Sequence, residues 1–269
     1  MGLFDFFRKK KPSADRDASS PTPSLCFVLC PSESPPDLSR LNSVVQRVFG
    51  PGYSADADEK NIVHISHGAD SVGFLAHMPA PVPGDEAAEN ADGNFLWPEG
   101  KAAAQAHRSH VIVTNMGSGE VPPIQSAVTV ARLALVALEL FDGIGVYWGN
   151  ASVSNSREVF ESFCQDLSEE HVPLPVMMRF QFVPQSDRTL SLYTLGLRQF
   201  GLMEIEVERS RKDLGDIFEF VSNIAHYLVQ SGPVIQDGNT VGGTAEEQII
   251  VRHKPSMIDK SRKVYKIGM

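Results

Sequence analysis

The chain has 269 residues, of which 42% are hydrophobic, and it carries a formal net charge of −9 at pH 7. This length supplies a core large enough for one big domain or for two fused halves. The acidic balance repels phosphate backbones, which argues against nucleic-acid binding, and no apolar run reaches the roughly 20 residues that span a bilayer.

The N-terminus combines two segments of different character. Residues 2–11 hold three phenylalanines, one leucine and four basic residues. This segment either makes weak peripheral contact with an anionic membrane, docks in a groove of a partner, or is a frayed tail with incidental charge. Residues 12–23 have no apolar side chain larger than alanine or proline, which predicts a flexible linker. We therefore separate a tail, residues 1–23, from a single globular domain, residues 24–269.

The cysteines favour a reducing compartment. Their number is odd and no secretory signal precedes them, so the expected location is cytoplasmic. Cys26 and Cys30 are four residues apart in a predicted strand, roughly 13 Å, which exceeds the ~7 Å limit for a disulfide. No second Cys or His pair has the spacing of zinc ligands. We expect Cys26, Cys30 and Cys164 to be buried small hydrophobic residues, and we predict neither a metal nor another cofactor.

From residue 24 onward, hydrophobic periodicity and turn residues predict alternating strands and helices. The predicted strands are residues 25–30, 62–67, 71–78, 109–115, 144–149, 175–184, 189–197 and 248–253. The predicted helices are residues 37–48, 85–107, 122–141, 156–167 and 212–231. The order β-α-β-β-α-β occurs twice, which predicts an α+β fold of two ferredoxin-like units in a two-layer sandwich. The similar halves are residues 24–121 and 122–269, with a long buried linking helix at 122–141.

The linking helix is apolar almost all round but keeps one narrow polar line. Gln125, Thr129, Arg132 and Glu139 fall within a small arc at 100° per residue. A charge in so apolar a helix must be paired or must reach water. Arg132 therefore either holds an anion or a carboxylate in a cleft, or reaches a surface rim or pairs with a carboxylate from another element.

The strand at 144–149 ends in two aromatic residues and an asparagine. Ligands commonly bind at strand ends in α/β layers, so Trp148 and Asn150 are candidate binding residues. The alternative is that Tyr147 and Trp148 lie on opposite faces and close one end of the core.

Other polar candidates lie at predicted element ends in the second half. Tyr193 lies within the predicted strand 189–197, Arg198 follows its end, and His226 lies opposite the apolar stripe of the last helix. Asp237 and Thr240 belong to a turn-rich loop with three glycines in seven residues. His226 is either a structural residue or part of a site. The alternating row Glu204, Glu206 and Glu208 is interpreted as a solvated strand face.

The sequence contains no recognisable catalytic motif. Gly-x-Ser-x-Gly, His-Glu-x-x-His, a phosphate-binding P-loop and a dinucleotide fingerprint are all missing from it. We predict no catalytic residue.

Four short strings stand out: Gly145-Val-Tyr-Trp-Gly149, Tyr193-Thr-Leu-Gly196, Asn223-Ile-Ala-His-Tyr227 and Asp237-Gly-Asn-Thr240. With Trp97-Pro98 and His107, they resemble a bacterial family catalogued as a domain of unknown function, numbered 4261. The resemblance covers roughly residues 25–255 and is strongest from His107 onward. It implies a soluble bacterial protein and transfers no catalytic residue to this chain.

Two functional hypotheses follow. The first is a non-enzymatic binding or interaction module with a protein partner, accessory or immunity-like within a larger bacterial system, because an acidic module complements a basic partner. The second is a small-ligand protein or enzyme with a pocket in the second half near Trp148 and Arg198, lined also by Asn150, Tyr193, His226 and Asp237.

Overall fold

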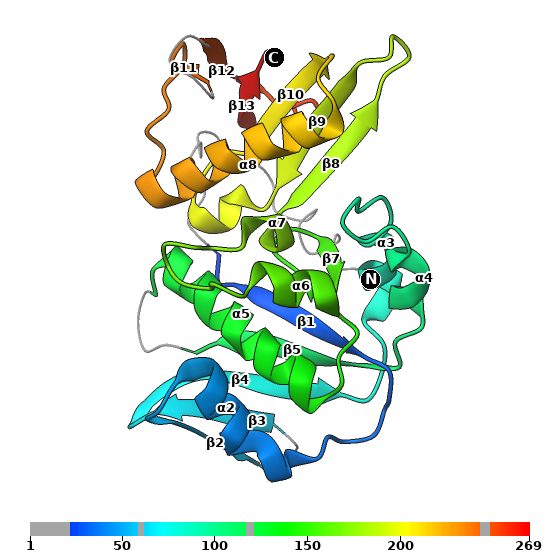
Figure 1. Ribbon diagram of the computed structural model, residues 1–269, viewed down its shortest axis with the longest axis vertical. Coiled ribbons are helices and arrows are strands. Elements are labelled where there is room, and N and C mark those ends of the chain that lie inside the picture. Colours follow the sequence, from blue (N-terminus) through cyan, green and yellow to red (C-terminus); the bar gives the residue numbers. More distant parts are fainter. Residues whose placement is uncertain (1–21, 59–61, 117–120, 243–247) are drawn as a thin grey trace. The chain divides into compact units, whose positions relative to one another are not determined.

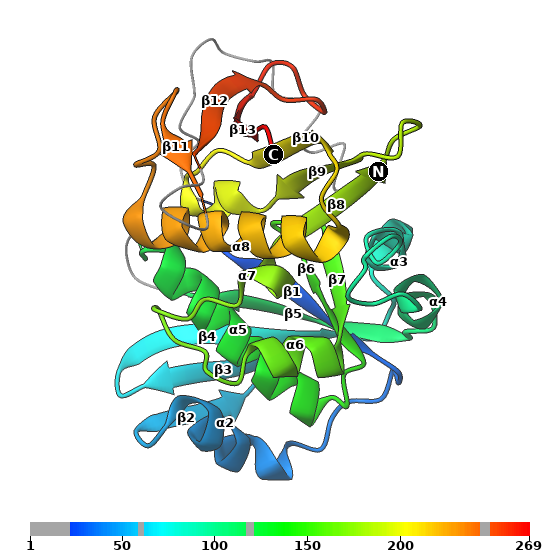
Figure 2. The same ribbon diagram turned by 45° about the horizontal axis from the view of Figure 1, so that its top comes forward.

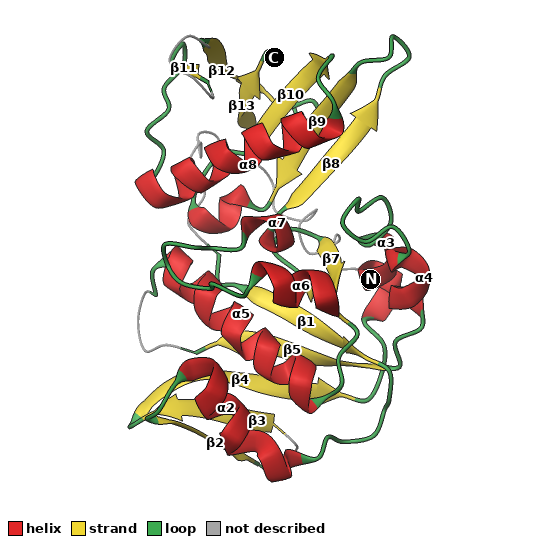
Figure 3. Cartoon of the chain, in the orientation of Figure 1, coloured by secondary structure: helices red, strands yellow, loops and turns green. Residues whose placement is uncertain are grey.

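A computed structural model describes residues 22–58, 62–116, 121–242 and 248–269 (Figure 1). The expected tail and its membrane contact fall almost wholly on residues 1–21, which lie outside the described residues. The chain forms two compact units, Pro23–Val176 and Met177–Met269. Helices and strands occur in both (Figure 3), so the mixed α+β class is confirmed.

The first unit is built on a seven-stranded, fully antiparallel sheet of order β2-β3-β4-β5-β1-β6-β7. Its strands are β1 (Leu25–Cys30), β2 (Tyr53–Ala57), β3 (Ile62–His67), β4 (Asp70–Met78), β5 (Ser109–Asn115), β6 (Gly145–Trp148) and β7 (Val153–Ser156). Its helical segments are η1 (Leu38–Arg40), α2 (Leu41–Phe49), η2 (Pro83–Asp85), α3 (Glu86–Glu89), α4 (Gly100–Gln105), α5 (Pro123–Leu140) and α6 (Arg157–Phe163). A short helix, α7 (Leu174–Met177), stands at the boundary between the units.

Helix α5 is the central helix of the first unit. It contacts β1, β4 and β5, and eleven of its 18 residues are buried. By length and composition alone it could also cross a membrane, a test that buried core helices pass too. The predicted burial of this helix is confirmed, because its small and branched apolar residues pack against the sheet.

Both faces of the first sheet are covered near β1 and β6. Leu29 and Tyr147 pack with Val82 and Trp97 in a cluster that includes α3 and α4. Trp148, the next residue along β6, stacks on Phe160 of α6, as expected from the alternation of side chains along a strand. This arrangement departs from the expected two-layer sandwich.

The strand order also differs from the ferredoxin-like plan, in which the first strand lies between the third and the fourth. Here β5 separates β1 from β4. Strand β6, expected to begin a second unit, instead pairs with β1, where Ile144 N–H donates to Leu29 O and Gly149 N–H donates to Leu25 O. Backbone pairing with β1 thus joins α5, β6 and β7 to the first unit, and the chain divides after Val176, whereas we expected residue 121.

The second unit contains a six-stranded sheet of order β11-β12-β13-β10-β9-β8, with β10 and β13 parallel (Figure 2). Its strands are β8 (Arg179–Pro184), β9 (Leu190–Leu195), β10 (Ile205–Ser210), β11 (Thr240–Val241), β12 (Ile249–Pro255) and β13 (Lys263–Ile267). The helical segments are η3 (Leu197–Phe200) and α8 (Leu214–Ser231). Phe218 of α8 meets Phe180 of β8 edge to face at 4.9 Å, which places the apolar stripe of α8 on this sheet.

The glutamate row along β10 is not a solvated face, contrary to the expectation. Glu204 and Glu206 are buried, and of the three only Glu208 is exposed. Alternation identified the strand but missed the segments that cover it, because those segments come from distant parts of the chain.

Candidate functional site

In the first unit, the predicted site residues Trp148 and Asn150 have structural partners. Trp148 is fully buried beside Phe160. Asn150 Oδ1 accepts a hydrogen bond from Leu25 N–H at 2.8 Å, and its Nδ2 donates to Pro23 O at 3.0 Å. Asn150 therefore fixes the entry of the chain into β1, and Trp148 fills the core beneath α6.

The polar line of α5 divides into two parts. Glu139 accepts hydrogen bonds from Arg40 and Arg47, which form ion pairs with it. Gln125, Thr129 and Arg132 instead line a pocket. The charge of Glu139 is thus neutralised by neighbours on η1 and α2, whereas Arg132 faces a cavity.

In the second unit, the predicted residues are spread over several elements. Tyr193 lies on β9 opposite Glu206, and the backbone N–H of Arg198 donates to Glu204. His226 is half-buried on α8. The structure does not bring these side chains into a single site with Asp237 and Thr240.

Thr240 lines an open groove of about 730 Å³ in the second unit. Its principal lining residues are Asn223, Ile224, Tyr227, Val234, Asn239 and Thr240. One wall is formed by residues of α8, and the other by the segment that leaves α8 and leads to β11. The groove thus joins two strings that stood apart in the sequence, at residues 223–227 and 237–240.

The groove wall after α8 is held by side-chain to backbone hydrogen bonds. Gly232 takes a positive φ of 78° and ends the helix. Asn239 Oδ1 accepts from Gln236 N–H at 2.8 Å, and Asp237 Oδ1 accepts from His253 N–H on β12, also at 2.8 Å. Asp237 and the side-chain oxygen of Asn239 therefore fix the shape of this wall. The turn-rich loop has this structural role.

The groove surface combines hydrogen-bonding groups with exposed apolar surface. The side chains of Asn223, Asn239 and Thr240 offer amides and a hydroxyl. Tyr227 is 53% exposed and Val234 is 44% exposed, both high values for large apolar side chains. Such a surface suits the binding of another chain through backbone hydrogen bonds and one or two anchoring side chains.

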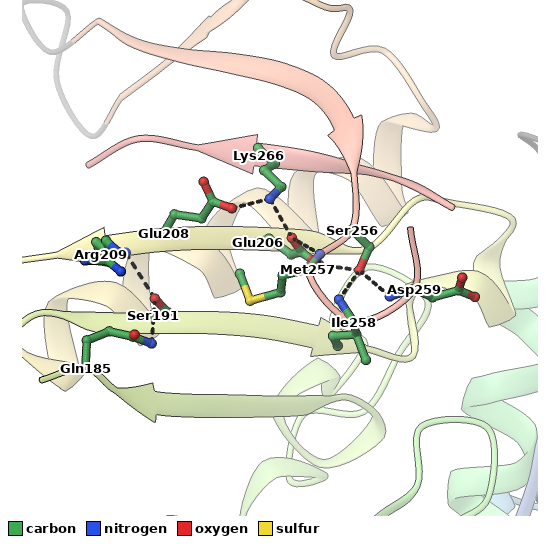
Figure 4. Close-up of polar contacts among 10 residues, drawn as sticks. All are labelled: Gln185, Ser191, Glu206, Glu208, Arg209, Ser256, Met257, Ile258, Asp259 and Lys266. Atoms are coloured by element: carbon green, nitrogen blue, oxygen red, sulfur yellow. Dashed lines mark hydrogen bonds and ion pairs between the residues drawn. The ribbon is translucent and has the colours of Figure 1, made fainter. Parts of the chain in front are cut away.

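Glu206, on β10 of the second unit's sheet, is the centre of a buried polar network (Figure 4). Its carboxylate accepts from the Ser256 hydroxyl and from Met257 N–H at 3.0 Å, and Lys266 Nζ lies 3.4 Å away. Ser256 Oγ in turn accepts from Ile258 N–H at 3.0 Å. The serine hydroxyl is committed to folding the 256–259 turn, which is not the arrangement of an activated nucleophile.

Glu204 is a second buried carboxylate with a structural role. It accepts from the Thr194 hydroxyl and from three successive backbone N–H groups, at residues 196, 197 and 198. Burial raises the pKa of the Glu204 carboxyl above its ordinary value of 4.5, while these hydrogen bonds oppose the rise. Glu204 thus closes the turn that begins η3.

This environment predicts a pH-dependent loss of stability. A carboxyl with a higher pKa in the folded state binds more protons there, so its contribution is complete below about pH 4.5 and declines as pH rises. Relative to Glu204→Gln, the wild-type chain should lose unfolding free energy between pH 4 and pH 7, as measured by urea denaturation. If the wild type instead gained unfolding free energy relative to Glu204→Gln as the pH rises, this assignment would be contradicted.

The cysteines behave as buried residues. All three are free and buried. Burial raises the pKa of both Cys30 and Cys164 to about 12, so their thiols stay protonated at neutral pH. Across residues 22–58, 62–116, 121–242 and 248–269, no group of three His, Cys, Asp or Glu side chains could hold a metal ion.

Sequence reasoning missed Asn223, Tyr227 and Asn239 as site residues. They carry no catalytic signature, and a half-exposed tyrosine on a helix is common. The available signal was their membership in the two distinctive strings, since each string contributes one wall of the groove.

A family model described as Domain of unknown function (DUF4261) matches residues 193–268. The match confirms the expected resemblance over this segment, which contains the strings that begin at Tyr193, Asn223 and Asp237. The string that begins at Gly145 lies outside it. No curated protein and no solved structure gave a match to the chain. The matched segment contains every residue of the groove described above.

Proposed function

We propose that the protein is a cytoplasmic, non-enzymatic binding module that holds an extended segment of a protein partner in the groove of the second unit. The observation that carries this proposal is the groove itself, where two amide side chains and a half-exposed tyrosine line about 730 Å³ of open space. An open groove with amides suits a peptide backbone, whereas small substrates favour enclosed pockets.

The charge around the groove favours a basic partner. Glu219, Asn223 and Tyr227 follow one another at intervals of four residues, so they share one face of α8. Glu219 is exposed and extends this wall with a carboxylate. The chain as a whole carries a net charge of −9. A partner segment with lysine or arginine beside an apolar anchor would complement both features.

The hydrogen bonding of the two buried carboxylates supports a binding role over a catalytic one. Glu204 accepts four hydrogen bonds within one turn, and Glu206 is shared between Ser256, Met257 and Lys266. Both carboxylates therefore use their oxygens in hydrogen bonds and ion pairs that stabilise the fold. The same proposal makes the protein an accessory component of a larger bacterial system that acts through contact with its partner, as the acidic charge and the missing catalytic motifs suggest.

Selection from a random peptide library tests the proposal. Peptides selected on the wild-type protein should be rich in basic residues, and Tyr227→Ala should weaken their binding about tenfold or more, since a central aromatic anchor carries much of such an affinity. The measurement is calorimetric titration of the selected peptides into both proteins.

Leu214→Ala is the matched control, because Leu214 is also an exposed apolar residue of α8 but does not line the groove. It should leave peptide affinity unchanged. Peptides that bind Tyr227→Ala as tightly as wild type would refute the site. Turnover of a small substrate by the purified protein, abolished by one substitution, would refute the non-enzymatic assignment.

A further inference from the structure

The sheet edge beside the groove of the second unit carries backbone groups that another strand could pair with. Strand β11 is the first in the order of its sheet, so it has a neighbouring strand, β12, on one side only. Val251 N–H donates to Asn239 O at 2.8 Å, and Thr240 is in register with Ile250. Hydrogen-bonded and non-hydrogen-bonded pairs alternate in an antiparallel ladder, so the N–H and C=O of Thr240 point away from β12. Because Thr240 is exposed and lines the groove, this edge offers a donor and an acceptor to an extended chain.

The α8 wall of the groove adds an aromatic side chain and, nearer the start of the helix, two carboxylates. Tyr227 lines the groove, and Asp216 and Glu219 are exposed on the preceding turns. Among the described residues, neither carboxylate is paired with a basic side chain. Glu219 and Tyr227 share one face of α8 and are roughly 12 Å apart along it, at a rise of 1.5 Å per residue. An occupant that runs along α8 thus needs an apolar side chain about 12 Å from a cationic one.

The N-terminal segment of this same chain, residues 2–11, has such a composition. It lies outside the described residues and holds three phenylalanines, one leucine and four basic residues. Phe4, Phe6 and Arg8 are spaced by two, so in an extended segment their side chains share one side. Phe4 and Arg8 are then roughly 13 Å apart, at 3.2–3.4 Å per residue. This spacing matches the separation of Tyr227 from Glu219 along the helix.

The length of chain that follows this segment gives it a long reach. Residues 12–22 span up to roughly 36–40 Å when fully extended. A compact unit of about 90 residues, the size of the second unit, has a radius of gyration of about 12 Å and is on the order of 30 Å across. The reach of the segment therefore exceeds the width of the unit that carries the groove.

We propose that residues 2–11 occupy the groove of their own chain as a strand added beside β11. The backbone of the segment pairs with the N–H and C=O of Thr240. Phe4 and Phe6 contact Tyr227, and Arg8 lies beside Glu219. The segment competes with the partner and so inhibits its binding, a consequence that rests on the proposed function, whereas the contact itself does not.

Backbone amide chemical shifts of the isotopically labelled full chain test the contact. The double variant Phe4→Ala/Phe6→Ala should move the amides of residues 223–227 and 239–241 relative to the wild type. Phe7→Ala is the matched control, because Phe7 lies on the opposite side of an extended segment and should leave these amides in place. The shifts should be the same at two protein concentrations. Groove amides that ignore the double variant, respond equally to Phe7→Ala, or respond only at the higher concentration would overturn the proposal.

A synthetic peptide with the sequence of residues 2–11 gives a second readout. In calorimetric titration it should bind the double variant saturably, and adding Tyr227→Ala to that variant should weaken the binding about tenfold or more. A peptide that binds phosphatidylglycerol vesicles but not the double variant would overturn the proposal and favour a membrane role for the segment.

Competition separates this proposal from the proposed function. At an effective concentration on the order of 1 mM, a segment whose free peptide has a Kd of about 100 µM fills the groove about ten to one. Library-selected basic peptides should then bind the double variant about tenfold more tightly than the wild type. Equal affinities for the two chains would overturn the self-inhibition and leave partner binding intact. Groove shifts caused by the double variant, with no selected peptide binding either chain, would support the contact and refute the partner.

Discussion

Replacing Glu206 by alanine is expected to lower the unfolding free energy of the second unit by about 3 kcal/mol, since Lys266 loses its buried partner and keeps only the exposed carboxylate of Glu208. Glu206 is only 1% exposed and the Lys266 side chain 15% exposed. The substitution also strips the acceptor from Ser256 and from Met257 N–H. Native-state amide hydrogen exchange in residues 177–269 measures the loss.

Glu208 provides the control for this prediction within the same strand. It also pairs with Lys266, but its side chain is 53% exposed. Glu208→Ala should therefore cost under about 1 kcal/mol, as exposed ion pairs usually do. Equal losses for the two substitutions would show that burial of Glu206 does not set the stability of this network.

Replacing Trp148 by alanine should destabilise the first unit by about 3–5 kcal/mol, the usual cost of truncating a large aromatic residue in a core. Trp148 is fully buried and stacks on Phe160 of α6, and its backbone pairs with Cys26 of β1. The lost side chain leaves a cavity that the surrounding strand and helix cannot fill. Urea denaturation followed by far-UV circular dichroism measures the change.

Phe163→Ala is the comparison for Trp148→Ala. Phe163 ends the same helix, but it is 39% exposed. Its truncation should cost under about 1 kcal/mol, because little apolar surface returns to water. A loss of stability under about 1 kcal/mol for Trp148→Ala would contradict its role in the core. It would favour the alternative that Trp148 binds a ligand.

The sequence predicts the individual elements of this protein better than their pairing. Helices α5 and α8 are identified because apolar residues recur at helical spacing, and β1, β4 and β5 because their apolar residues form short bounded runs. Element order cannot reveal that β5 separates β1 from β4. Strand order depends on backbone pairing between distant segments, which the periodicity of one segment does not encode.

Burial of charge is the second feature that local patterns miss. Glu206 reads as a solvent-facing residue because it alternates with apolar neighbours along β10. Its partners Ser256 and Lys266 lie 50 and 60 positions further along the chain. By contrast, the polar line on α5 does place Gln125, Thr129 and Arg132 together, since residues on one helix face remain neighbours in any fold, and a cleft at Arg132 was one of the two alternatives left open.

The groove shows what a distinctive string can and cannot tell. Residues 223–227 and 237–240 are recognisable in the sequence as unusual strings. Neither string indicates that Asn223 and Asn239 line the same groove. That convergence depends on the turn after Gly232 and on the hydrogen bond from His253 N–H to Asp237. Both are tertiary features.

The most direct test of the central claim is to map a selected basic peptide by backbone amide chemical shifts on the isotopically labelled full chain. We expect the largest changes in residues 223–227 and 234–242, the two walls of the groove. Changes concentrated in residues 23–176, with the groove amides unmoved, would contradict the claim that the second unit is the binding surface.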